Sequence, residues 1–292
     1  MSSPMATGSI WAFDAIGTSW AIDTAHPLPT VARDAVSSVV ERFDREWSRF
    51  RDDSLMTALA EGRTASVPAP EDADAMLSLY RELDAATSGA VNPLVGDALA
   101  RVGYDARLTL APWGEPQPAP SWTEVLSWDA DRVSVSMPAT IDVGALGKGR
   151  LVDLVLDTVS GFVDGDLVVD ASGDLAARGT PVRVGLEHPY DATRAIGVVT
   201  VAEGALCASA INRRAWGDGL HHVLDARTGA PVRAYAATWA LAETAMRADA
   251  LATALFFDGG PELAASWNAD WVRMRTDGRV EWSPGFSGEI FS

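Results

Sequence analysis

The stretch "IDVGALGKGRLVD", residues 141–153, connects an apolar strand-like run to the start of an amphipathic helix. Gly144, Gly147 and Gly149 allow the main chain to approach a ligand closely. The helix that begins there offers free N–H groups and the positive end of its dipole to an anion, and Lys148 adds a full positive charge. The stretch therefore predicts an anion-binding turn, or else a glycine-rich helix start with a solvated lysine.

The common nucleotide-binding loops do not match this stretch. A phosphate loop has four residues between its glycines and a Ser or Thr after its lysine. Here only Ala145 and Leu146 separate Gly144 from Gly147, and a further glycine follows Lys148. The G-x-G-x-x-G pattern of a Rossmann site does not follow any strand-like run of the sequence. The sequence therefore argues against both of these nucleotide sites.

A second cluster, "INRRAWGDGLHHVLDARTGAPV" at residues 211–232, gathers basic and titratable side chains in an acidic chain. His222 precedes Asp225 by three residues, which is typical either of a proton-transfer pair or of a turn capped by its own side chain. His221 and His222 are too close together, with too few partners, to form a zinc site. The cluster predicts acid–base chemistry or a structural turn.

A third cluster lies in "AMRADALATALFF", residues 245–257. Asp249 and Thr253 are four residues apart and so lie on one face of a helix. A carboxylate and a hydroxyl one turn apart suit a hard cation such as Mg²⁺, and the alternative is a solvated polar stripe. Because the neighbouring residues are mostly alanine and leucine, we expect a largely buried helix, in which an acid requires a partner.

The composition restricts the partners and the location. The 292 residues include 40 acidic and 23 basic side chains, so the net charge is −17 and the surface repels nucleic acids and anionic membranes. No run approaches the roughly 20 apolar residues that span a bilayer, and the N-terminus does not resemble a secretory signal. We therefore expect a cytoplasmic protein with no membrane insertion and no nucleic-acid partner. The single cysteine, Cys207, has apolar neighbours and is expected to be a buried thiol.

Helical and strand-like periodicities both occur in the chain. Apolar residues recur at helical spacing in 31–47 and 72–89, and further helices are expected at 146–159 and 244–257. From residue 132 onward, short β-branched or alternating runs predict strands, and "WVRMRTDGRVEW" predicts a hairpin that turns at Asp277-Gly278. Without regular βαβ alternation, this order favours an α+β fold. The proline-rich segment 106–121 is expected to be an exposed loop or a subdomain junction.

Six short segments together resemble the motifs of the ApbE family of FAD:protein FMN transferases, in the family's order and over about residues 13–258. Each match is weak alone, but six in series are specific. The chain departs from the family pattern at Ile16, Asn92, Ala145, Gly147, Ser172 and Ala226, which suggests a divergent branch. The segments are "AIGTSW" (15–20), "SGAVNPLVGDAL" (88–99), "DVGALGKG" (142–149), "DASGDL" (170–175), "HHVLDARTGAPV" (221–232) and "ADALATA" (248–254).

The resemblance implies an activity and a fold. The activity is Mg²⁺-dependent cleavage of the FAD pyrophosphate, with FMN passed to a threonine hydroxyl of a target flavoprotein and AMP released. The fold is α+β, a single compact unit over residues 1–292 with a T-fold-like core of antiparallel strands and helices. Two alternatives keep the same site. In one, water is the acceptor and the protein is an FAD pyrophosphatase; in the other, the protein binds FAD without reaction.

The resemblance also implies a metal site. Asp249, Thr253 and the main-chain carbonyl of Gly147 would bind Mg²⁺. Lys148 would lie near the diphosphate or orient the metal-binding acid. Asp142 would brace the glycine turn.

Roles in proton transfer and in FAD binding follow in the same way. His222 would accept the proton of the acceptor threonine, because histidine changes charge near neutral pH. Asp225 would orient His222 or accept that proton itself. FAD contacts are expected at Ile16, Asn92, Asp142, Gly144, Gly147, Ser172, Thr228 and Gly229.

Overall fold

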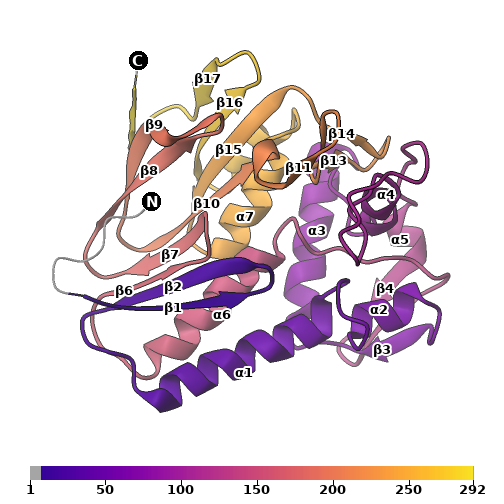
Figure 1. Ribbon diagram of the computed structural model, residues 1–292, viewed down its shortest axis with the longest axis horizontal. Helices are drawn as coiled ribbons and strands as arrows, with labels where there is room; N and C mark the ends of the chain where they lie inside the picture. The colour runs from indigo at the N-terminus through magenta and orange to yellow at the C-terminus, as the bar shows by residue number, and fades with distance from the viewer. Residues whose placement is uncertain (1–7, 292) are drawn as a thin grey trace.

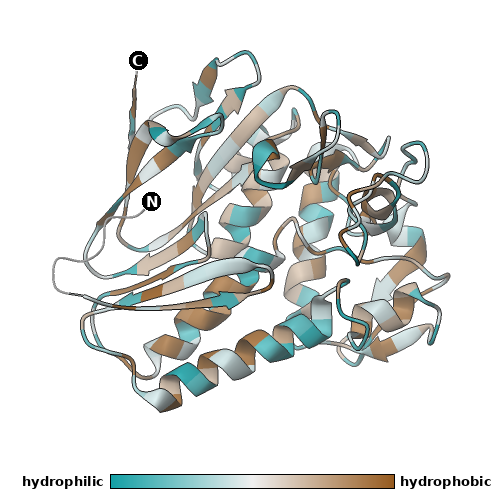
Figure 2. Ribbon diagram, viewed as in Figure 1, coloured by the Kyte–Doolittle hydropathy of each residue, from teal (hydrophilic) through white to brown (hydrophobic). Residues whose placement is uncertain are grey.

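The computed structural model describes residues 8–291, and its four longest helices lie where the apolar periodicity predicts them. Apolar and hydrophilic bands alternate along the first of these helices, which buries one face (Figure 2). The second ends where Ser88 and Gly89 adopt left-handed conformations. The last ends short of residue 257 because the N–H groups of Phe256 and Phe257 bond to carbonyls three residues back. The four are α1 (Thr30–Trp47), α3 (Ala73–Thr87), α6 (Gly147–Ser160) and α7 (Ala245–Ala254).

Within residues 8–291, the largest sheet has eight strands in the order β1-β2-β6-β7-β10-β15-β16-β17 (Figure 1). Every neighbouring pair in it is antiparallel, which confirms the α+β class. The strands are β1 (Ser9–Ala15), β2 (Thr18–Thr24), β6 (Leu167–Asp170), β7 (Asp174–Arg178), β10 (Gly204–Ala210), β15 (Tyr235–Ala242), β16 (Asp270–Arg275) and β17 (Val280–Trp282).

Central strands of this sheet are covered on both faces. In β10, Ala205 and Cys207 belong to the core formed with the helices, whereas Leu206 packs into a second core on the opposite face. Because successive side chains of a strand point to opposite faces, burial on both sides makes these strands apolar throughout. The second core lies under a smaller sheet of β8 (Val182–His188), β9 (Asp191–Val201) and β18 (Glu289–Ile290).

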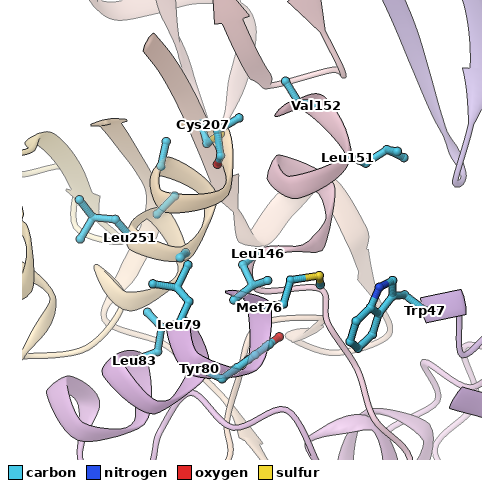
Figure 3. Packing of buried hydrophobic residues seen from close by; sticks show 14 of the residues in the cluster. Trp47, Met76, Leu79, Tyr80, Leu83, Leu146, Leu151, Val152, Cys207 and Leu251 are labelled. Carbon is cyan, nitrogen blue, oxygen red and sulfur yellow. The ribbon is translucent and has the colours of Figure 1, made fainter. Parts of the chain in front are cut away.

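The helices form the larger core. α6 packs against α1 and α7, and α6 and α7 also contact the large sheet. Figure 3 shows Trp47, Met76, Tyr80 and Leu146 in this core, and all four are fully buried. Leu146 immediately precedes α6, so this packing fixes the position at which the glycine turn enters the helix.

Shorter elements complete the chain. They are the helices α2 (Leu55–Ala60), α4 (Gly96–Arg101), α5 (Trp122–Val125) and α8 (Gly260–Ser266), a 3₁₀ turn at Ile211–Arg214, and the strands β3 (Ser66–Pro68), β4 (Leu126–Trp128), β5 (Arg132–Val135), β11 (Ala215–Trp216), β12 (Leu220–His221), β13 (Leu224–Asp225) and β14 (Ala230–Pro231). The proline-rich segment 106–121 is a largely exposed loop whose end is anchored by a hydrogen bond from Ala119 N to Ala226 O (2.8 Å).

Other expectations can be compared directly with the structure. β16 and β17 form the predicted hairpin, and Gly278 in its turn has φ +90°. Cys207 is a buried free thiol, as predicted. In the part of the chain that the structure describes, we find no helix with the length and apolar character needed to cross a membrane.

Candidate active site

The glycine turn before α6 is held by Asp142. Its Oδ1 accepts a hydrogen bond from Gly144 N (2.7 Å), and its Oδ2 pairs with the buried guanidinium of Arg49. The hydroxyl of Tyr80 donates to the main-chain carbonyl of Asp142 (3.0 Å). Arg49 lies just after the end of α1 and Tyr80 lies in α3, so residues distant in the sequence fix the conformation of the turn. Arg49 was not expected from the sequence, in which nothing marks it as a partner of Asp142.

The first turn of α6 lies directly against α7. Gly149 N donates to Asp249 Oδ2 (2.9 Å), and the hydroxyl of Thr253 donates to the carbonyl of Ala145 (3.3 Å). Asp249 and Thr253 thus face the glycine turn from one side of α7, as their spacing predicts. Because the Thr253 hydroxyl uses its proton on Ala145, its lone pairs can still accept a further bond.

Lys148 lies between two buried carboxylates. Its ammonium is 3.3 Å from Asp174 Oδ2 and donates to the carbonyl of Ala171 (3.3 Å). Burial raises the pKa of both Asp174 and Asp249, and their mutual repulsion raises the pKa of Asp249 further. Burial would lower the pKa of Lys148, but the two carboxylates raise it, so the amine is charged at neutral pH. Lys148 is also the only lysine of the chain, the other basic residues being arginines.

With both carboxylates ionised, this buried cluster would carry one negative charge more than Lys148 neutralises, and the raised pKa values reflect that cost. Asp174 is fully buried and Asp249 is nearly so, and the single charge of Lys148 faces both. A buried charge without compensation is costly, so the cluster favours the approach of a cation. Among residues 8–291 we find no group of three or more His, Cys, Asp and Glu side chains that could hold a metal ion. Any metal here would need hydroxyl, carbonyl or ligand oxygens beside Asp249.

Hydrogen bonds connect five of the six sequence segments to one another through the glycine turn. Asp142 N donates to Pro93 O (2.8 Å), and Ala226 N donates to Ala90 O (3.0 Å), so the segments at 88–99 and 221–232 join the turn. Lys148 links the turn to the segment at 170–175, and Gly149 links it to α7.

The remaining segment, the β1–β2 turn, is joined through Ser172. Its hydroxyl donates to Ser19 O (2.7 Å). Ile16 and Gly17 form this turn with φ of +45° and +74°. Ser172 also has a positive φ, +56°. At Ile16 and Ser172 the backbone therefore adopts a conformation that glycine adopts more easily.

His222 lies beside an aromatic and cationic group. Its ring is 6.4 Å from that of Tyr104, which stacks on Trp216 and whose hydroxyl accepts a hydrogen bond from Arg214 (2.7 Å). Burial, and then the charge of Arg214, lower the pKa of His222 to about 3, against an opposing effect of Asp142. Its Nδ1 is buried and has no hydrogen-bond partner among the described residues. His222 is therefore a neutral imidazole with one nitrogen unused, and in the folded chain it does not change charge near neutral pH, contrary to the expectation from the sequence.

Asp225 does not make the contacts expected of it. Both of its carboxylate oxygens bind Arg227, at 2.9 Å from Nε and 2.6 Å from Nη2, rather than His222. Its main-chain carbonyl accepts from Thr228 N and Gly229 N (3.0 and 2.7 Å). Asp225 thus organises the loop and does not orient the imidazole. The left-handed Gly229 packs so closely on Gln117 that a Cβ would lie 2.1 Å from its carbonyl oxygen.

Asn92 also makes structural contacts. Its side-chain nitrogen donates to Pro120 O (2.9 Å), and its side-chain oxygen accepts from Leu94 N (2.8 Å). The amide therefore anchors the end of the proline-rich loop next to the histidine loop. Asp174 is the charged partner that the sequence reasoning missed, although "DASGDL" contains it: a lone Asp at a strand end gives no sign that it will meet Lys148.

The chain is similar to known proteins over most of its length. The ApbE family model matches residues 16–272. A protein of Rhodobacter capsulatus named FAD:protein FMN transferase is 28% identical in an alignment of length 299 that covers 93% of this chain and 56% of that protein. A Treponema pallidum protein of the same name is 26% identical, covering 78% of this chain and 71% of its own length. This chain thus spans little more than half of the first relative.

The fold is shared as well. The crystal structure of the ApbE protein of Thermotoga maritima superimposes with a TM-score of 0.82 at 22% identity, covering 94% of this chain and 97% of that one. The protein belongs to the ApbE family. The family resemblance inferred from the six segments is therefore confirmed.

Proposed function

We propose that this chain transfers FMN from FAD to a threonine hydroxyl of a target flavoprotein, with Mg²⁺ bound and AMP released. The main support for this function is that hydrogen bonds bring all six segments together around Lys148 and Asp249. The names of the two relatives support flavin transfer as the reaction class.

The donor set suits a hard divalent cation. Asp249, the hydroxyl of Thr253 and the carbonyl of Gly147 would hold it, and the carbonyl of Ala145 lies close to the same hydroxyl. Two buried carboxylates share the single charge of Lys148, so a bound cation would stabilise their ionised forms, and this supports the assignment. When bound, Mg²⁺ would supply charge neutralisation at the diphosphate oxygens.

The chain's own residues would position the substrates and move one proton. Lys148, charged and held by Asp174, would present its ammonium to the diphosphate. The acceptor hydroxyl would form a bond to the phosphorus of the FMN half while the bond from that phosphorus to AMP breaks. His222, neutral and with Nδ1 unused, would take the hydroxyl proton.

The test of this function follows both products at once. Purified protein is incubated with FAD and Mg²⁺, with and without a domain that carries a threonine flavinylation motif, and AMP release and acceptor mass are recorded. Transfer predicts AMP together with a mass gain of one FMN on the acceptor. AMP and free FMN without that gain would identify an FAD pyrophosphatase instead. FAD that stays bound and intact would identify a non-catalytic binding protein.

Removal of divalent cations is expected to lower AMP release roughly 100-fold or more, since metal charge stabilisation contributes several kcal/mol to such reactions. The measurement is the initial rate after exhaustive chelation and after addition of Mg²⁺ or Mn²⁺. A rate that survives chelation would exclude the metal assignment and leave Lys148 as the main source of charge.

Replacement of His222 by alanine is expected to slow flavin transfer about 10²–10⁴-fold, the usual contribution of a general base. His188→Ala is the matched control, because His188 lies outside the six segments and its Nδ1 accepts from Tyr190 N. The assay is the rate of acceptor flavinylation at saturating FAD. An unchanged rate in His222→Ala would assign the proton to another group.

His222 is also expected to affect how the stability of the fold depends on pH. Because the pKa of His222 is lowered to about 3 in the folded chain, the unfolded chain binds more protons between about pH 3 and 6.5. This residue therefore makes stability fall as the pH drops through that window. Urea unfolding at pH 7 and pH 5 should show a smaller loss of stability for His222→Ala than for the unaltered chain. Equal losses would mean that the imidazole is solvated and not held neutral.

A further inference from the structure

The two helices that carry the cluster satisfy each other's N-termini. α6 begins after Leu146, whose apolar side chain cannot cap it, and Gly149 N in its first turn donates to Asp249 of α7. In return, Ala245 N and Met246 N in the first turn of α7 donate to the two oxygens of Asp153 on α6 (2.7 and 2.9 Å). Thr244 completes the start of α7 by accepting from Arg247 N.

This reciprocal arrangement fixes how the helices lie along each other. Gly149 and Asp153 are one turn apart on α6, and Ala245 and Asp249 are one turn apart on α7, so both pairs lie on facing sides. The contacts run in opposite directions along the two helices, as in an antiparallel pair. A carboxylate at each end therefore holds the register of one helix against the other.

We propose that Asp153 is a positioning residue that sets the place of Asp249 relative to the glycine turn, and so sets the affinity of the site for a divalent cation. This rests on the function proposed above. Asp153 is partly buried between the helices and binds main-chain N–H groups one turn before Asp249. Its loss would leave the Asp249 end of α7 held by the hydrogen bonds from Gly149 to Asp249 and from Thr253 to Ala145. Groups that orient metal ligands in this way typically change metal affinity 10–100-fold when they are replaced.

The test measures metal affinity apart from turnover. Mn²⁺ is titrated into the full chain, with and without FAD, and free Mn²⁺ is followed by electron paramagnetic resonance. Asp153→Asn, which keeps one acceptor and places an amide against the other N–H, is expected to weaken Mn²⁺ binding about 10-fold or more. Thr244→Ala is the matched control: it removes a bond at the same helix start but none to α6. Its Mn²⁺ affinity should stay near that of the unaltered chain.

Each result decides between readings. If Asp153→Asn and Thr244→Ala lose the same amount of Mn²⁺ affinity, only the start of α7 matters and the inference is overturned. If neither variant loses Mn²⁺ affinity, the inference is overturned as well. No Mn²⁺ binding by the unaltered chain would instead refute the proposed metal site. If Asp153→Asn does not fold, Asp153→Glu serves in its place. The Asp153→Glu variant keeps the charge, but its side chain is one methylene longer and cannot place the carboxylate in the same position. This variant should still bind Mn²⁺ more weakly, and an unchanged affinity would overturn the inference.

Discussion

The variant Gly149→Ala is expected to be at least about 1–3 kcal/mol less stable than the unaltered chain and to lose most of the FAD cleavage activity. A Cβ at this position would lie 2.2 Å from Ala245 O and 2.7 Å from the Cβ of Asp249. Both contacts involve atoms that cannot rotate away, so α6 and α7 would have to separate. The bond from Gly149 N to Asp249 would lengthen with them, and the acid would move away from the glycine turn.

Urea unfolding and AMP release measure the two effects. Gly161→Ala, just beyond the end of the same helix, is the control, because its Cβ would meet only Thr158 O at 3.4 Å. That variant should keep full activity and a stability within about 1 kcal/mol of the unaltered chain. If Gly149→Ala matched it in both measurements, the close packing of the two helices would be refuted.

Lys148→Met is expected to abolish FAD cleavage and to destabilise the fold by about 3–5 kcal/mol, the cost of leaving a buried charge without its partner. Asp174, fully buried, would face Asp249 with no ammonium between them. The pKa of Asp174, already raised by burial, would rise further, so the destabilisation should grow as the pH rises above about 3.9, the ordinary pKa of an unfolded Asp.

The double variant Lys148→Met/Asp174→Asn separates stability from chemistry. Without the buried carboxylate, most of the lost stability should return, whereas FAD cleavage should not, because the charge facing the diphosphate is still missing. Urea unfolding at pH 6 and pH 8 and AMP release are the measurements. Recovery of activity in the double variant would show that Lys148 acts only as the partner of Asp174.

Lys148 also offers a direct probe of accessibility. It is the only lysine of the chain, so an amine-directed reagent has no other side-chain target. Its side chain is 25% exposed, while that of Asp174 is fully buried. The Lys148 side chain is thus partly accessible to solvent although its carboxylate partner is not.

The sequence by itself determined the long helices, the antiparallel class and the segments of the site. Periodicity over 31–47 and 146–159 is local information, and amphipathic helices follow from it within one or two residues. The spacing of Asp249 and Thr253 likewise fixed their common face on α7. Six ordered segments were enough to assign the family, since order along a chain is a property of sequence.

Only the tertiary structure decided which groups face each other. Arg49 meets Asp142, and Lys148 meets Asp174, across long stretches of chain, and no local pattern encodes such pairs. The structure also shows the Asp225 carboxylate paired with Arg227, two residues away, and not with His222. Charge, burial and pKa depend on these neighbours, and the packing of helices on the sheet brings the neighbours together.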